Sequence, residues 1–113
     1  MLKERDKSLL NLIIKRSNRI LGKVNGLSLD EFISNDDYKE IICFNIFQIG
    51  ELAHSLSNEF FIAHNLIPWK QTIGMRNKIV HGYDTIDYEI VYNTALVDIK
   101  HLKEYCETIL QTK

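Results

Sequence analysis

The sequence predicts an all-α protein, an antiparallel bundle of four to five helices. Apolar residues recur at spacings of three, four and seven along most of the chain, which is the period of amphipathic helices. The chain also has one Pro and five Gly, and 45% of its residues are hydrophobic. No linker rich in Ser, Gly or Pro divides its 113 residues. We therefore expect a single domain, 1–113.

The first predicted helix runs from about Glu4 to Val24, and basic residues separate its apolar positions. Gly22, Asn25 and Gly26 are suited to ending it. The side chains that we expect to face the core are Leu9, Leu12, Ile13, Ile20, Leu21 and Val24.

A short second helix is predicted by Ser28 and Glu31, which stand three residues apart in the pattern of a capping box. This helix should extend through residues 32–33. Asn35 and the two Asp residues after it then offer N-cap side chains for the next helix.

The third helix, residues 38–57, carries a long apolar stripe and should be the central helix of the bundle. Asn45 and Glu51 fall in or beside that stripe. We expect both to be exposed, although a role in lining a cleft or an interface stays open. Gly50 favours the close approach of a neighbouring helix.

The second half of the chain predicts further helices. Residues 58–65 continue helical, and Pro68 suits the first turn of a helix that stops near Gly82. Residues 88–111 form the last helix. The residues expected to be buried on it are Ile90, Val91, Thr94, Leu96, Val97, Leu102, Tyr105 and Ile109.

Composition excludes several classes of protein. Apolar runs are about four residues long, far short of the roughly twenty that cross a bilayer, and the N-terminus lacks the pattern of a secretory signal. We therefore expect a cytoplasmic protein without membrane contact. Cys43 and Cys106 are expected to be reduced packing residues. The net charge of -1 requires any nucleic-acid site to be a local concentration of positive charge.

No metal or cofactor is expected. His54, His64 and His101 lack the spacing of metal ligands and are interpreted as solvated or capping residues.

The stretch from Arg76 to Tyr83 carries the chemistry. It places a permanent cation, Arg76, an imidazole that can titrate, His81, and a phenol, Tyr83, within eight residues. Metal-free cleavage of a phosphodiester needs such groups. A charged helix end with a capping His is the alternative interpretation. Arg76 and His81 are about 140° apart around a helix axis, but the reach of Arg closes that gap if His81 lies where the helix ends.

Five motifs in the chain resemble the HepT-like toxins of the HEPN superfamily, over about residues 27–102. They are Ile-Gly-Glu-Leu-Ala (49–53), Leu-Ser-Asn-Glu-Phe (56–60), Ile-Pro-Trp (67–69), Gly-Met-Arg-Asn (74–77) and Val-His-Gly-Tyr (80–83). The family pattern of Arg, four residues, His, any residue and Tyr is met by Arg76, His81 and Tyr83.

This resemblance implies a homodimeric endoribonuclease toxin of a type VII-like toxin-antitoxin system, dimerising through the central helices. RNA, and not DNA, would be its substrate. Its partner would be an MntA-type nucleotidyltransferase antitoxin, which silences the toxin by adenylylating Tyr83.

The expected mechanism uses a composite site at the dimer interface and no metal. Arg76 and His81 would be the catalytic residues, and the ribose 2′-OH would attack the phosphorus. Asn77, Tyr83 and Glu51 would support them. A non-catalytic helical adaptor that presents substrate to a nucleotidyltransferase is the competing interpretation, although an adaptor has no chemical reason to keep the Arg76 and His81 pair.

Overall fold

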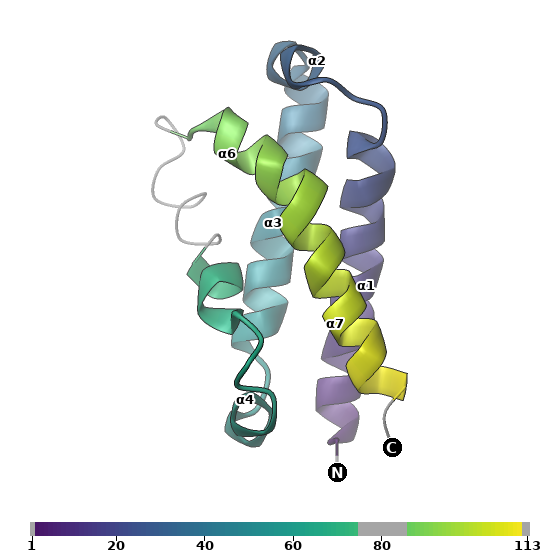
Figure 1. Cartoon of the computed structure of the whole chain (residues 1–113), viewed down its shortest axis with the longest axis vertical. Helices are drawn as coiled ribbons and strands as arrows, with labels where there is room; N and C mark the ends of the chain where they lie inside the picture. Colours follow the sequence, from purple (N-terminus) through teal and green to yellow (C-terminus); the bar gives the residue numbers. More distant parts are fainter. Residues whose placement is uncertain (1, 75–85, 112–113) are drawn as a thin grey trace.

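The computed structural model describes residues 2–74 and 86–111, and every regular element in these two ranges is helical. The all-α prediction is therefore confirmed. The three longest elements are α1 (Glu4–Val24), α3 (Asp36–His54) and α7 (Ile99–Gln111). Helix α1 packs against both α3 and α7, and the run that ends in α7 crosses obliquely over α3 and α1 (Figure 1).

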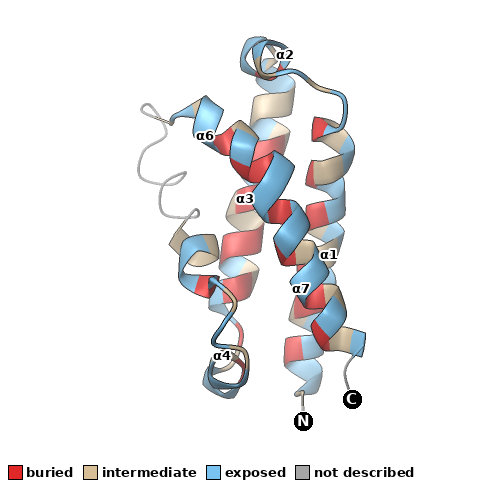
Figure 2. Cartoon of the chain, in the orientation of Figure 1, coloured by how far each residue is buried: buried red, intermediate tan, exposed pale blue. Residues whose placement is uncertain are grey.

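The core lies where these three helices meet, as the buried positions in Figure 2 show. Its buried side chains come from all three helices. They include Leu10, Ile13 and Ile20 of α1, Ile42, Ile46 and Ile49 of α3, and Ile99, Leu102 and Cys106 of α7. Each buried aliphatic side chain contributes roughly 1.5–3 kcal/mol relative to its exposed state, so this apolar contact is the main source of the fold's stability.

Helix α1 has the predicted bounds, but its buried face differs in part from the prediction. Ile13, Ile20 and Val24 are buried as expected, whereas Leu12 is 43% exposed. Asp6 and Ser17, two polar residues, are buried in the same face. Periodicity locates an apolar face only to within a residue or so, and the positions of α3 and α7 decide its exact orientation.

The predicted capping box is confirmed at α2 (Leu29–Ser34). The backbone N–H of Glu31 donates to Ser28 Oγ at 3.1 Å, and the Ser28 N–H donates to Glu31 Oε1 at 2.9 Å. Gly26, with φ of 76°, supplies the left-handed turn between α1 and α2. Asn35 then caps α3, because its Oδ1 accepts from the Tyr38 N–H at 3.0 Å.

Helix α3 ends at His54, before the predicted residue 57, and α4 (Asn58–Ala63) begins as a separate helix. Ser57 is the reason for the break. Its Oγ accepts from the Phe60 N–H at 3.1 Å and so starts a new helix. The N–H and the hydroxyl of Ser57 both donate to the carboxylate of Asp6, at 3.0 Å and 2.6 Å. The start of α1 is thereby tied to the corner between α3 and α4.

Residues 69–74 are helical, as Pro68 predicts, and the rest of that predicted helix lies outside the described residues. Trp69 fixes this segment to α4. Its indole Nε1 donates to the His64 carbonyl at 3.2 Å, and its ring lies 5.3 Å from that of Phe60, edge to face. His64 is half-buried beside Phe60, while His54 and His101 are exposed.

The last predicted helix, 88–111, is one continuous helical run made of α6 (Tyr88–Asn93), η2 (Thr94–Asp98) and α7. The π-helical turn η2 was not predicted, since a π turn leaves no signal in apolar periodicity. Four residues predicted to be buried are instead exposed: Ile90 by 48%, Leu96 by 37%, Val97 by 50% and Tyr105 by 43%. Val91, Thr94, Leu102 and Ile109 are buried as expected.

Both cysteines are free and buried, as the sequence analysis expects. Burial raises the pKa of the Cys106 thiol to about 12. Burial also raises the pKa of Cys43 to about 11, although the nearby Lys39 charge opposes that shift. Both thiols therefore stay protonated near neutral pH and act as packing groups.

None of the helices in the described ranges is both long enough and apolar enough to cross a membrane.

Replacing Asp6 by Ala should lower the free energy of unfolding by about 2–3 kcal/mol, because the Ser57 N–H and hydroxyl lose a charged acceptor in a buried position. Urea denaturation followed by circular dichroism measures this change. The control is Glu104→Ala on the exposed side of α7, which should stay within about 0.5 kcal/mol of wild type. Equal effects of the two substitutions would show that the Asp6 contact contributes nothing.

Alkaline pH should destabilise the protein through its thiols. The ordinary pKa is 9.0 and that of folded Cys106 is about 12, so the unfolded chain loses its thiol proton first. The unfolding free energy should thus fall as pH rises above 9 and level off near 12. Denaturation at several pH values should show a shallower fall for Cys106→Ala, and a smaller change for Cys43→Ala. Parallel curves for all three proteins would contradict this expectation.

Candidate functional site

Four of the five predicted site residues, Arg76, Asn77, His81 and Tyr83, lie outside the described residues. Their roles therefore stay predictions. Glu51 is described and lies exposed on α3, as one of the two alternatives expected. Asn45 is only 1% exposed, so the expectation of exposure was wrong for this residue, and it lines a cleft instead.

A groove of about 460 Å³ lies beside the described ends of the segment that carries the predicted site. Gly74, the last described residue before that segment, lines it, and so does Ile90 near the start of α6. Its apolar wall is formed by Ile46 and Ile49 of α3 together with Ile99 and Leu102 of α7. The groove is thus built on the same helices that form the core.

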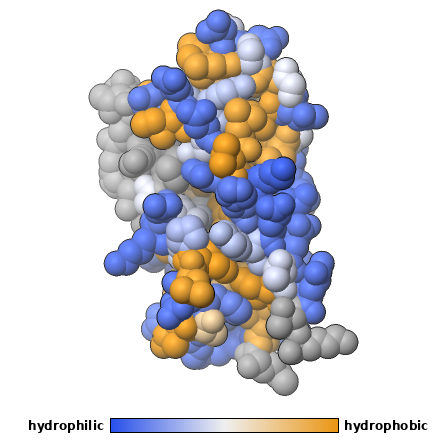
Figure 3. Space-filling view, viewed as in Figure 1, coloured by the Kyte–Doolittle hydropathy of each residue, from blue (hydrophilic) through white to orange (hydrophobic). Residues whose placement is uncertain are grey.

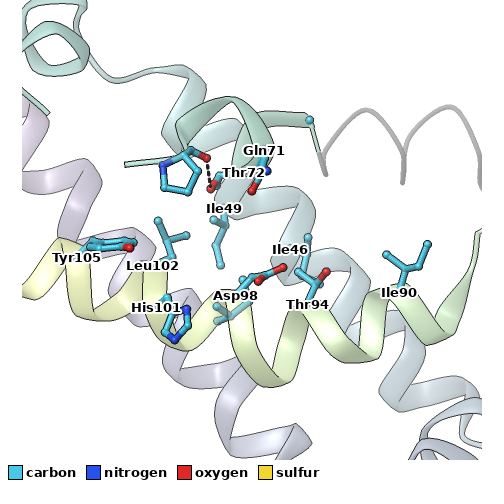
Figure 4. Close-up of a pocket in the computed structure, with 13 residues that line it drawn as sticks. Ile46, Ile49, Gln71, Thr72, Ile90, Thr94, Asp98, His101, Leu102 and Tyr105 are labelled. Atoms are coloured by element: carbon cyan, nitrogen blue, oxygen red, sulfur yellow. Dashed lines mark hydrogen bonds between the residues drawn. The ribbon is translucent and has the colours of Figure 1, made fainter. Parts of the chain in front are cut away.

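Polar side chains border the groove on two sides. Figure 4 shows Gln71 and Thr72 on one side and Thr94 and Asp98 on the other, with side chains of α3 between them. Thr72 Oγ1 donates to the Pro68 carbonyl at 3.5 Å, which orients this hydroxyl along its own helix. His101 and Tyr105 of α7 complete the polar lining.

The π turn shapes the second of these sides. The Ile99 N–H donates to the Thr94 carbonyl, five residues earlier, so the loop closed by this hydrogen bond holds one more residue than that of an α-helix. Thr94 and Asp98, at the two ends of the turn, both reach the groove. Turns of this kind are frequent at functional sites. Sequence reasoning missed Asp98, Gln71 and Thr72, because no motif marks them.

Apolar surface gathers near this groove as well. Over α6 and η2, Figure 3 shows apolar side chains next to a polar band, in agreement with the exposed Ile90, Leu96 and Val97. Another apolar area surrounds α4, where Ile62 and Leu66 are 75% and 96% exposed.

In the described ranges, no group of three or more His, Cys, Asp or Glu residues is placed to hold a metal ion. The two thiols are protonated core residues and are unsuited to nucleophilic attack. The described polar groups of the groove suit binding and orientation of a ligand by hydrogen bonds, and its apolar wall suits a flat or aliphatic group.

Comparison of the sequence with known proteins identifies its family. The family model described as "Ribonuclease HepT-like" matches residues 13–109. "Putative RNase TTE0752" of Caldanaerobacter subterraneus subsp. tengcongensis is 30% identical over 102 residues, which cover 90% of this chain and 91% of the relative. "Putative RNase MJ1380" of Methanocaldococcus jannaschii is 27% identical and covers 91% of this chain and 94% of its own length.

A shorter match joins the chain to "Probable ribonuclease HepT" of Thermococcus cleftensis, with 36% identity over 55 residues, 49% of this chain and 50% of the relative. No solved structure matches. Because the family model spans 13–109, which includes α3, most of α7 and the stretch from Arg76 to Tyr83, we conclude that this chain belongs to the HepT-like ribonuclease family.

Proposed function

We propose that this protein is the ribonuclease toxin of a toxin-antitoxin pair, and that it cleaves RNA without a metal ion at a site shared by two copies of the chain. One observation carries the proposal. Arg76, His81 and Tyr83 keep the spacing of the family pattern within the range that the HepT-like model matches. The relatives that match nearly the full length are named as ribonucleases.

The proposed reaction is a transfer of the phosphodiester to the neighbouring ribose hydroxyl. His81 takes the proton of the 2′-OH while the 2′-oxygen forms a bond to phosphorus. The bond from phosphorus to the 5′-oxygen breaks, and an acid, His81 of the second copy, supplies a proton to that oxygen. The products are a 2′,3′-cyclic phosphate and a 5′-hydroxyl. Arg76 stabilises the charge that develops on the phosphoryl oxygens.

Asn77 and Tyr83 support this reaction in the proposal. Asn77 precedes His81 by four residues, a spacing that would place it one turn away on a helix and suit it to orient the imidazole. Tyr83 positions the phosphate. Glu51 is assigned a supporting place at the rim of the shared cleft.

Two copies are needed for a physical reason. One chain has a net charge of -1, and a single Arg76 offers little attraction for a polyanion. A two-fold axis brings a second Arg76 and a second His81 to the same phosphate, and symmetric dimers are the commonest oligomers. The proposal includes pairing of the two copies through the central helix, α3.

Regulation in the proposal acts on Tyr83. A partner nucleotidyltransferase of the MntA type transfers adenylate from ATP to the phenol oxygen and releases pyrophosphate. The product carries an anionic phosphodiester and a bulky nucleoside beside Arg76. Both oppose the binding of RNA, by repulsion and by steric exclusion. The proposal places this reaction in the cytoplasm.

The purified protein should cleave single-stranded RNA in the presence of EDTA and leave 2′,3′-cyclic phosphate ends. His81→Ala and Arg76→Ala should each reduce the rate at least about a hundredfold, since general acid-base catalysis contributes roughly that much or more. Gel electrophoresis of a labelled RNA and mass spectrometry of its ends measure both outcomes.

The control for this experiment is thermal unfolding of each variant, which should match wild type if the loss of cleavage is chemical. Cleavage of DNA, or of RNA with a 2′-O-methyl group at the cut, would contradict attack by the 2′-OH. Absence of cleavage, together with stable binding to the nucleotidyltransferase, would support the adaptor interpretation.

Incubation with the nucleotidyltransferase and ATP should add the mass of one or more adenylate groups to the wild-type chain and abolish cleavage. Tyr83→Phe should gain no mass and stay active in the same mixture, because it lacks the phenol oxygen. Intact-mass spectrometry and the RNA assay give the two readouts. Tyr105→Phe, at an exposed tyrosine of α7, is the matched control and should be modified like wild type. Modification of Tyr83→Phe would overturn the assignment.

A further inference from the structure

The positive charge of this protein is concentrated on one helix. After Asp6, α1 carries Lys7, Lys15, Arg16, Arg19 and Lys23 and no acidic residue. The other nine Lys and Arg residues of the chain stand against all fifteen Asp and Glu residues. The net charge of -1 therefore hides a local cationic surface, which is what a polyanion would bind.

Three of these cations line a second groove, of about 540 Å³, between α1 and α3. Lys15, Arg16 and Arg19 form its α1 side, and Glu40, Phe44 and Asn45 of α3 form the other. The groove lies on a different side of α3 from the one described above, since residues 46 and 49 line that groove and residues 40, 44 and 45 line this one.

The cations of this groove are available to a ligand. The ion pairs in the described ranges join Lys3 to Glu59, Lys7 to Glu4 and Lys39 to Asp36, and none of them involves a cation of the groove. Lys15 and Arg19 are four residues apart and exposed, so they lie one turn from each other on the same side of α1.

Arg16 is held in place by a buried residue. Its Nη1 donates to Asn45 Oδ1 at 3.3 Å, and Asn45 Nδ2 donates to the Ile41 carbonyl at 2.8 Å. Asn45 is 1% exposed and Arg16 is half-buried, so both hydrogen bonds are partly shielded from water. One guanidinium N–H is occupied in this way, and the others remain able to donate to phosphate oxygens.

An aromatic ring stands among these cations. Phe44 is 53% exposed, and the guanidinium carbon of Arg16 lies 5.7 Å from the centre of its ring. Further along α1, Lys23 Nζ lies 5.5 Å from the ring centre of Tyr38. An exposed ring beside cations is the arrangement on which proteins stack the bases of single-stranded nucleic acid while binding its phosphates.

We propose that the groove between α1 and α3, called here the α1–α3 groove, binds the backbone of single-stranded RNA through residues that are not part of the Arg76–Tyr83 motif. Lys15, Arg16 and Arg19 contact phosphates, and one base stacks on Phe44. This inference rests on the proposed function in naming RNA as the ligand. An acidic protein surface would match the charges equally well, but it would leave the exposed Phe44 ring without a planar partner.

Glu40 is the one acidic residue that lines the groove, and its charge provides a test of opposite sign. Its carboxylate repels phosphates that approach the three cations. Removing that charge should therefore strengthen RNA binding, whereas removing a cation should weaken it. A surface without a role in RNA binding would show neither effect.

The test uses the full chain and a short fluorescent single-stranded RNA with every 2′-oxygen methylated, so that binding is measured without cleavage. Fluorescence anisotropy at several salt concentrations gives the affinity and its salt dependence. The double variant Lys15→Gln/Arg19→Gln should bind about tenfold more weakly. The slope of log K against log salt should shrink by about 1.4, as expected when two phosphate contacts to a single strand are lost.

Matched variants test whether the loss of RNA affinity is specific to the groove or follows from any loss of positive charge or of an exposed apolar side chain. Lys100→Gln/Lys103→Gln removes the same charge from α7 and should change affinity less than about twofold. Phe44→Ala should weaken binding by about fivefold or more, because stacking of one base is lost, whereas Leu66→Ala, at a residue 96% exposed beyond α4, should have no effect. Glu40→Gln should tighten binding about twofold.

Three outcomes would overturn the inference: equal affinities for the α1 and α7 double variants, no effect of Glu40→Gln and Phe44→Ala, or binding of a labelled polyglutamate peptide in place of RNA. These results are distinguishable from failure of the proposed function. Groove-dependent binding of the methylated RNA without cleavage of unmodified RNA contradicts only the ribonuclease. Cleavage with unchanged binding by the groove variants contradicts only the α1–α3 groove.

Discussion

Burial of helix α3 against its neighbours is the constraint on which the rest of this structure depends. Ile42, Ile46 and Ile49 are almost completely removed from water, and the free energy of that burial fixes the helix in position and rotation. Ile46 and Ile49 also line one groove, and Glu40, Phe44 and Asn45 of the same helix line another. A rotation of α3 would expose core residues and change both grooves together. Packing and ligand surfaces are therefore coupled in this bundle.

Hydrogen bonds at the corners hold the ends of the helices. The Asp6 carboxylate accepts from Ser57 where α3 gives way to α4. The Tyr92 hydroxyl donates to the Leu27 carbonyl and joins α6 to the turn after α1. Trp69 attaches residues 69–74 to the carbonyl of His64. The contacts of Trp69 and Tyr92 lie near the two described ends of the segment that carries the family motif.

The balanced composition and the proposed activity on RNA are compatible because charge is distributed unevenly. Cations collect on α1, whose acidic residues are confined to its first turn, and the other acidic residues are spread over the rest of the chain. A polyanion responds to the local potential within about a Debye length, roughly 8–10 Å in physiological salt. Net charge alone is therefore a poor guide to a binding surface in a small domain.

The sequence by itself determined the helical class, the bounds of α1, the capping box of α2, the N-cap of α3 and the family motif, because each depends on near neighbours along the chain. Only the tertiary structure decided that Asn45 is buried and bonded to Arg16. It also decided that Leu12, Ile90 and Tyr105 are exposed. The hydrogen bond from Ser57 to Asp6, between residues far apart in the chain, depends on it as well. The tertiary structure also decided the π turn that brings Asp98 to a groove. These features depend on which helix packs against which face, and that choice is made by long-range burial, which a local pattern does not encode.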